Sequence, residues 1–185
     1  FAARRAGMEV EFVDIELDTL GMNIVELKKK NIEDQVVCMM HTGGVVSKNV
    51  DDFRKLCDDM GSILIEDCAH SFGATLNGKH SGLFGDAGVY SLYATKAVPV
   101  GEGGIIVSND QELHEMAQKF IIYDRFDQQL DVGVNLRMSE INALLSYSVL
   151  EETESIIANK YRIAEKYQSA CKKFGWEYIV PSDDD

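Results

Sequence analysis

The sequence predicts an α/β fold with three layers, in which a mostly parallel sheet carries helices on both of its faces. Short apolar runs of strand length alternate with segments whose apolar residues recur at helical spacing. The run 36–40 is followed by an amphipathic segment at 50–60 and then by a second apolar run at 62–65. Because consecutive strands joined by a helix pair in parallel, this alternation favours a parallel sheet covered by helices.

Each expected element follows from its own pattern. Strands are expected at 10–13, 36–40, 62–65, 89–92, 104–107 and 176–180. Helices are expected at 24–30, 50–60, 113–120, 141–149 and 151–174. Asn49 and Ser139 are typical N-cap residues for the helices that follow them, and Gly61 is placed to end the helix at 50–60.

Composition limits the classes of partner and compartment. Acidic residues outnumber basic ones by 31 to 18, which gives a formal net charge of -13 and disfavours nucleic acid as a partner. No apolar run reaches the length of a membrane span, so we expect no membrane segment. The four cysteines form no C-x-x-C pair and no zinc-site spacing with histidine, so we expect a cytoplasmic protein without a metal. The chain starts at Phe1 with neither an initiator methionine nor a signal peptide, so we expect a fragment.

Asp67 is the first candidate functional residue. With Glu66, it stands at the carboxyl end of the apolar run at 62–65, and ligands of open α/β sheets bind outside the carboxyl ends of the strands. Burying this carboxylate without a partner would cost several kcal/mol. It is therefore either a helix cap or solvated turn residue, or a carboxylate that faces a cationic ring nitrogen or a metal. No cluster of residues with metal-ligand spacing accompanies it, which makes the metal the weaker of the last two.

Lys96 is the second candidate, because it lies between two apolar segments and lysine is rarely buried. It is either a turn lysine with its ammonium in water, or a desolvated amine whose lowered pKa suits it to form an imine. The glycine-rich run 101–104, Gly-Glu-Gly-Gly, follows it and permits sharp turns and close approach of the backbone.

A third candidate is the segment 133–140. Asn135 and Arg137 flank Leu136, so in an extended loop both side chains can reach one anion. The alternative is a loop whose only task is to cap the next helix through Ser139.

Five sequence runs, in this order, resemble those of one enzyme family. They are Glu66 to Ala74, Gly82 to Asp86, Ser91 to Lys96, Gly101 to Gly104 and Gly133 to Glu140. From about Gly7 to Tyr167 the chain resembles the DegT/DnrJ/EryC1/StrS aminotransferases, the pyridoxal-phosphate (PLP) dependent sugar aminotransferases of fold type I. The resemblance implies an incomplete fold-type-I structure. Residues 1–150 would be part of the large PLP-binding domain, and residues 151–185 a linking helix and the start of a small C-terminal domain.

The resemblance also implies a role for each matched residue. Lys96 matches the lysine that forms the Schiff base with PLP, and Asp67 matches the acid that pairs with the pyridine nitrogen. His70 matches a position that contacts the ring-hydroxyl side of the cofactor, and Ser91 one that contacts the phosphate. Asn135 matches an asparagine that reaches the phosphate of the neighbouring subunit, which implies a homodimer with a shared active site.

The activity that the resemblance implies is transfer of an amino group from glutamate or glutamine to a keto-sugar nucleotide, in cell-surface polysaccharide biosynthesis. A relative that performs deoxygenation has histidine in place of the lysine, so Lys96 argues against that branch. The family's phosphate-binding helix start lies upstream of the matched region, and Ala97 stands where asparagine is frequent. These departures keep open a truncated, non-catalytic relative that acts as a binding or regulatory protein. Another fold-type-I enzyme, such as a lyase or desulfurase, is disfavoured because no cysteine lies in a recognisable persulfide loop.

Overall fold

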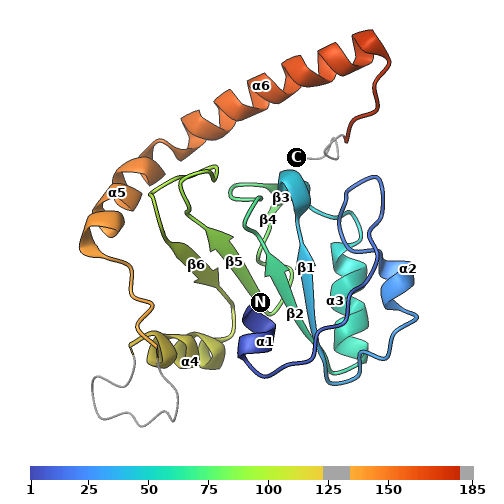
Figure 1. Cartoon of the computed structure of the whole chain (residues 1–185), viewed down its shortest axis with the longest axis vertical. Helices are drawn as coiled ribbons and strands as arrows, with labels where there is room; N and C mark the ends of the chain where they lie inside the picture. The colour runs from blue at the N-terminus through green and yellow to red at the C-terminus, as the bar shows by residue number, and fades with distance from the viewer. Residues whose placement is uncertain (123–133, 180–185) are drawn as a thin grey trace.

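The central feature of the computed structural model, which describes residues 1–122 and 134–179, is a four-stranded sheet with the order β1-β2-β5-β6. Its strands are β1 (Val36–Met40), β2 (Ile63–Asp67), β5 (Ala87–Ser91) and β6 (Gly104–Val107). β1 pairs in parallel with β2, and β2 with β5, whereas β6 is antiparallel to β5 (Figure 1). β6 reverses direction because residues 92–103 contain no crossover helix. The α/β class and the mostly parallel sheet are confirmed.

One face of the sheet packs against α3 (Val50–Asp59). Side chains alternate across a strand, and Val37, Met39 and Leu64 are the buried set on β1 and β2. They form one hydrophobic cluster with Phe53 and Cys57 of α3. The apolar stripe of α3 at helical spacing therefore meets the period-two pattern of the strands, as the sequence predicts.

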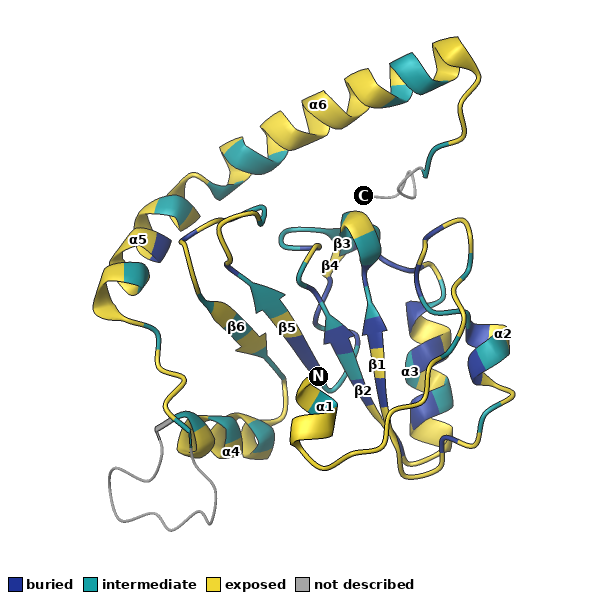
Figure 2. Cartoon of the chain, in the orientation of Figure 1, coloured by how far each residue is buried: buried dark blue, intermediate teal, exposed yellow. Residues whose placement is uncertain are grey.

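The opposite face of the sheet exposes apolar side chains. Val36, Ile63 and Val89 point to this face and are 37%, 46% and 40% exposed. The yellow and teal residues on the strands in Figure 2 alternate with the dark blue buried ones. The sheet is therefore covered unevenly, with an apolar surface exposed on this face.

The remaining elements surround the sheet. They are α1 (Ala2–Arg5), α2 (Ile24–Leu27), the 3-10 turn η1 (Thr42–Gly44), β3 (Thr75–Leu76), β4 (Lys79–His80), α4 (Gln111–Ile122), α5 (Glu140–Glu151) and α6 (Thr153–Phe174). α6 extends beyond the sheet and has no buried residue (Figure 1). No helix within the described ranges is both long and apolar enough to cross a membrane.

The expected helix boundaries are largely met. Ser139 Oγ accepts a hydrogen bond from Asn142 N at 3.2 Å and caps α5. Gly61, with φ +65°, follows the end of α3, as expected. Asn49 occupies the N-cap of α3, but its side chain makes no capping bond and instead donates to Glu16 Oε2 at 3.3 Å.

Two expected strands differ from the structure. Residues 10–13 form no strand, because their backbone groups pair with no strand of the described sheet. Only an isolated bridge between Ile15 and Met22 follows it. Residues 176–179 also form no strand, and residue 180 lies outside the described residues.

Candidate functional site

Asp67 and Ser91 lie on the same face of the sheet, at the carboxyl ends of β2 and β5. Asp67 is paired in register with Val89, and Ser91 is two residues further along β5, so its side chain points to the same side. The backbone N–H of Ala69 donates to Asp67 Oδ1 at 3.0 Å. Within residues 1–122 and 134–179, Oδ2 takes no hydrogen bond, so this oxygen can receive a proton donor from a ligand on the exposed face.

Lys96 lies in the loop that joins β5 to β6, which begins at the same edge of the sheet. The glycine-rich run forms the returning limb of this loop: Gly101 O accepts from Ala94 N at 3.0 Å, and Gly103 O accepts from Leu92 N at 2.9 Å. Gly101 has φ +91°, a conformation that favours glycine. Val98 and Val100 are buried and anchor the loop to the protein. The run therefore has a structural task, which is to fix the loop that carries the half-buried Lys96.

His70 is oriented by the turn after β1. The backbone N–H of Gly43 donates to His70 Nδ1 at 3.3 Å. In the neutral imidazole, Nδ1 is then the acceptor and Nε2 carries the proton. The exposed ring can therefore donate from Nε2 to an anionic oxygen. The sequence alone does not predict this tautomer.

His41 and Glu66 form a fully buried pair that sequence reasoning missed. His41 Nε2 lies 2.7 Å from Glu66 Oε2, and both side chains have no exposed surface. Glu66 also accepts backbone hydrogen bonds from Gly82 N at 2.7 Å and Gly85 N at 2.6 Å. Burial raises the pKa of the Glu66 carboxyl, but the hydrogen bonds from His41, Gly85 and Gly82 outweigh it and lower that pKa below its usual value. The sequence signal that could have revealed this pair is the position of Glu66, two residues after the apolar Leu64 and therefore on the same, buried face of the strand.

The same region holds a cluster with metal-ligand atoms. Donor atoms of His41, Glu66 and Cys68 lie within 4.8 Å of one another, and in the described part of the chain this is the one such group. Both Glu66 oxygens already accept N–H donors, and burial raises the pKa of the Cys68 thiol to about 11, which disfavours the thiolate that a metal needs. The geometry therefore favours a hydrogen-bond network over a metal centre.

Among the described residues, Asn135 makes side-chain hydrogen bonds only with Arg137 and none with Asp67, His70, Ser91 or Lys96. It is exposed, and its Oδ1 accepts from Arg137 Nε at 3.3 Å. The adjacent Val134 N donates to Phe120 O of α4 at 3.0 Å, and Figure 1 shows α4 near the edge of the sheet opposite the carboxyl ends of β2 and β5. Gly133, at the start of the expected motif, lies outside the described residues.

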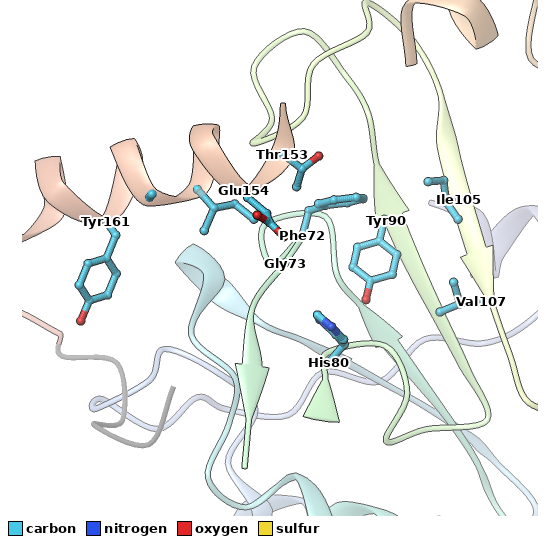
Figure 3. Close-up of a pocket in the computed structure, with 11 residues that line it drawn as sticks. Phe72, Gly73, His80, Tyr90, Ile105, Val107, Thr153, Glu154 and Tyr161 are labelled. Atoms are coloured by element: carbon cyan, nitrogen blue, oxygen red, sulfur yellow. The ribbon is translucent and has the colours of Figure 1, made fainter. Parts of the chain in front are cut away.

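A cavity of about 870 Å³ lies on the other side of the sheet from Asp67. Tyr90, Ile105 and Val107 line it from β5 and β6, and Ile157 lines it from α6 (Figure 3). Tyr90 and Ile105 are a register pair that alternates with Val89, so they point away from the exposed face that carries Asp67 and Ser91. The cavity is therefore separate from the candidate site.

The fold, with an acid, a serine and a lysine loop at one sheet edge, defines a chain of the PLP-dependent transferase type. Residues 1–185 match the DegT/DnrJ/EryC1/StrS aminotransferase family, and the chain belongs to this family. The resemblance read from the motifs is thereby confirmed.

Three relatives illustrate the match. GDP-perosamine synthase of Vibrio cholerae is 35% identical over 164 residues, which cover 85% of this chain and 44% of that protein. GDP-4-keto-6-deoxy-D-mannose 3-dehydratase of Escherichia coli O55:H7 is 32% identical, covering 99% of this chain and 56% of that protein. The crystal structure of a DegT/DnrJ/EryC1/StrS aminotransferase from Brucella abortus superposes with a TM-score of 0.82 and 26% identity, over 94% of this chain and 51% of that one. The chain thus spans about half the length of its relatives.

Proposed function

We propose that this chain carries the PLP-binding core of an aminotransferase that moves an amino group from glutamate to a keto-sugar nucleotide. The observation that carries the proposal is the placement of Asp67 and Ser91 on one sheet face, at the edge where the Lys96 loop begins. Substrate class is supported by relatives whose names specify GDP-linked sugars. No observation on the chain favours the non-catalytic alternative.

The chemistry of the donor set supports PLP as the ligand. Asp67 offers a carboxylate oxygen on the exposed face, Ser91 offers a hydroxyl on the same face, and His70 presents a protonated Nε2 nearby along the chain. A cationic ring nitrogen, an anionic phosphate and a ring oxygen are complementary to these three groups. Lys96 supplies the amine for covalent attachment.

The residues divide the work of amino transfer. When bound, PLP supplies an electrophilic carbon and an electron-accepting ring. The Asp67 carboxylate holds a proton on the ring nitrogen, which keeps the ring electron-deficient. Lys96 Nζ would be the group that takes up a proton from the substrate and returns it during the transfer. Over both half-reactions, glutamate becomes 2-oxoglutarate and the sugar ketone becomes an amine.

We also propose a homodimer that shares the active site. Val134, the neighbour of Asn135, is hydrogen-bonded to Phe120 O of α4 near the opposite edge of the sheet, which supports a contact of Asn135 with the phosphate of a second copy. α5, which follows Asn135, exposes Ile141, Leu144 and Tyr147 to 80%, 74% and 68%. An apolar helix face of this kind is typical of a surface that a partner covers.

Two further expectations remain proposals. We assign residues 1–150 to a part of the large domain and residues 151–185 to a linking helix and the start of a small domain, and the extension of α6 beyond the sheet supports this division. A cytoplasmic location accords with four cysteines that form no disulfide. A place in cell-surface polysaccharide biosynthesis rests on the family resemblance alone.

The activity is tested by incubating the protein with PLP, L-glutamate and GDP-4-keto-6-deoxy-D-mannose, and by following 2-oxoglutarate together with the mass of the sugar nucleotide. The proposal expects equimolar 2-oxoglutarate and aminated sugar nucleotide, and neither product with Lys96→Ala. Loss of a sugar hydroxyl without amination would instead indicate the reaction for which the Escherichia coli relative is named. No product from several keto-sugar nucleotides, with PLP bound, would contradict the proposed substrate class.

A further inference from the structure

We propose that the buried His41–Glu66 pair is a positioning device that holds Asp67 and His70 in the orientation the cofactor requires, an inference that rests on the function proposed above. Neither His41 nor Glu66 faces the exposed side of the sheet, so neither contacts the cofactor. Their effect is transmitted through hydrogen bonds and the backbone.

Glu66 holds the end of β2 from the face of the sheet opposite Asp67. It is adjacent to Asp67 and points to the opposite face, because side chains alternate along a strand. Its carboxylate accepts three N–H donors, from His41, Gly82 and Gly85, at 2.6 to 2.7 Å. Gly82 and Gly85 tie the end of β2 to the loop before β5, and His41 ties it to the residue after β1. Rotation of β2 about its axis, which would redirect Asp67, would therefore break several hydrogen bonds at once.

His41 connects this anchor to both cofactor-facing side chains. Its backbone N–H donates to Asp67 O at 3.1 Å, directly beside the functional carboxylate. His41 also begins the turn η1, in which Gly43 N holds His70 Nδ1. Gly44 packs so closely that an added Cβ would lie 3.1 Å from His70 O. His41 therefore links the Glu66 anchor, through its ring, to the backbone of Asp67 and to the turn that holds His70.

Only a carboxylate at position 66 can accept all three N–H donors. A carboxylate accepts hydrogen bonds at both oxygens, whereas the amide of Glu66→Gln places an N–H₂ group against one of the three N–H donors. A buried donor without an acceptor destabilises that arrangement locally. The substitution keeps the volume of the side chain and thus tests the hydrogen bonds rather than packing.

Asp86 provides a matched control at the other end of the same strand. Asp86 Oδ2 accepts from Leu64 N at 2.6 Å and from Arg54 Nη1 at 2.6 Å. Asp86→Asn is therefore the same chemical change in a carboxylate that anchors β2, but at the edge of the sheet remote from Asp67. It is expected to lower stability without changing PLP affinity.

The test measures the PLP dissociation constant of the apoprotein by absorbance titration, in a double-mutant cycle with His70→Gln. Glu66→Gln is expected to weaken PLP binding on the order of tenfold, comparable with loss of a supporting hydrogen bond behind a metal ligand. In the double variant Glu66→Gln/His70→Gln, the PLP dissociation constant is expected to rise by less than the product of the two single fold-changes, because both changes disturb the same contact. Asp86→Asn and His70→Gln are expected to be additive.

A milder pair of variants covers the case in which Glu66→Gln does not fold. His41→Gln retains an N–H donor toward Glu66, and His41→Leu removes it, so only His41→Leu is expected to weaken PLP binding. PLP affinity unchanged in Glu66→Gln, or equal effects of the two His41 variants, would overturn the positioning role while leaving the proposed function intact. A wild-type protein that binds no PLP would overturn both.

Discussion

Asp67 and Ser91 point to the same face of two neighbouring parallel strands, with Asp67 in register with Val89. This relationship places an anion and a hydroxyl on one surface, at the carboxyl edge from which the Lys96 loop departs. Because ligands of open α/β sheets bind at that edge, we expect Asp67, Ser91 and Lys96 each to contact the cofactor.

Asp67→Asn is expected to lower kcat/KM roughly a hundredfold or more, since a neutral amide cannot hold the proton on the ring nitrogen of the cofactor. The amide preserves the acceptor for Ala69 N, so the midpoint of thermal unfolding should stay close to that of the wild type. Steady-state kinetics with saturating PLP measure the effect. An unchanged kcat/KM would remove Asp67 from the proposed site.

Cys68 is expected to make stability depend on pH in the alkaline range. Burial is the main cause that raises its pKa from 9.0 to about 11, so the folded state retains the thiol proton after the unfolded chain has lost it. The contribution is fully present below about pH 9 and is lost as pH rises toward 11, with a magnitude of roughly 2–3 kcal/mol.

Urea unfolding at pH 8 and at pH 10.5 measures this dependence. The difference in unfolding free energy between wild type and Cys68→Ala should shrink at the higher pH. A difference that is the same at both pH values would show that the Cys68 thiol is not shielded from water as the structure indicates.

Gly88 is expected to tolerate no side chain. A Cβ at Gly88 would lie 2.3 Å from Gly82 Cα and 2.6 Å from Gly82 O, and backbone atoms cannot move aside as a flexible side chain can. Gly88→Ala should therefore lower the unfolding free energy by about 1–3 kcal/mol. Gly104→Ala, whose Cβ would meet Tyr90 O at 3.1 Å in the same strand pair, is the comparison and should cost less. Equal losses in denaturant unfolding would argue against the close approach at Gly88.

Leu144→Glu is expected to weaken the proposed dimer, because it places a charge at the centre of the exposed apolar face of α5. Ser155→Glu adds the same charge at an exposed position on α6 and should leave association unchanged. Sedimentation velocity over a range of protein concentrations compares the two variants with the wild type. A wild-type protein that stays monomeric at all concentrations would refute the dimer.

The sequence predicts those elements whose signals are local. β1, α3 and β2 follow from apolar periodicity, and the caps at Ser139 and Gly61 follow from residue type. The strand expected at 10–13 is wrong, because a strand needs hydrogen-bonding partners that its own sequence does not specify.

The candidate site shows the same limit. Asp67 and Lys96 are visible in the sequence because each stands out beside an apolar segment. The role of Glu66 is not, because its three donors come from positions 41, 82 and 85, which only the fold brings together. The tautomer of His70 depends likewise on Gly43, 27 residues away.

The most direct test of the central claim is borohydride reduction of the protein with bound PLP, followed by peptide mapping by mass spectrometry. We expect loss of the imine absorbance and one pyridoxyl adduct, on Lys96, with none in Lys96→Ala. An adduct on a different lysine, or no adduct while PLP is bound, would contradict the assignment of Lys96 as the cofactor-bearing residue.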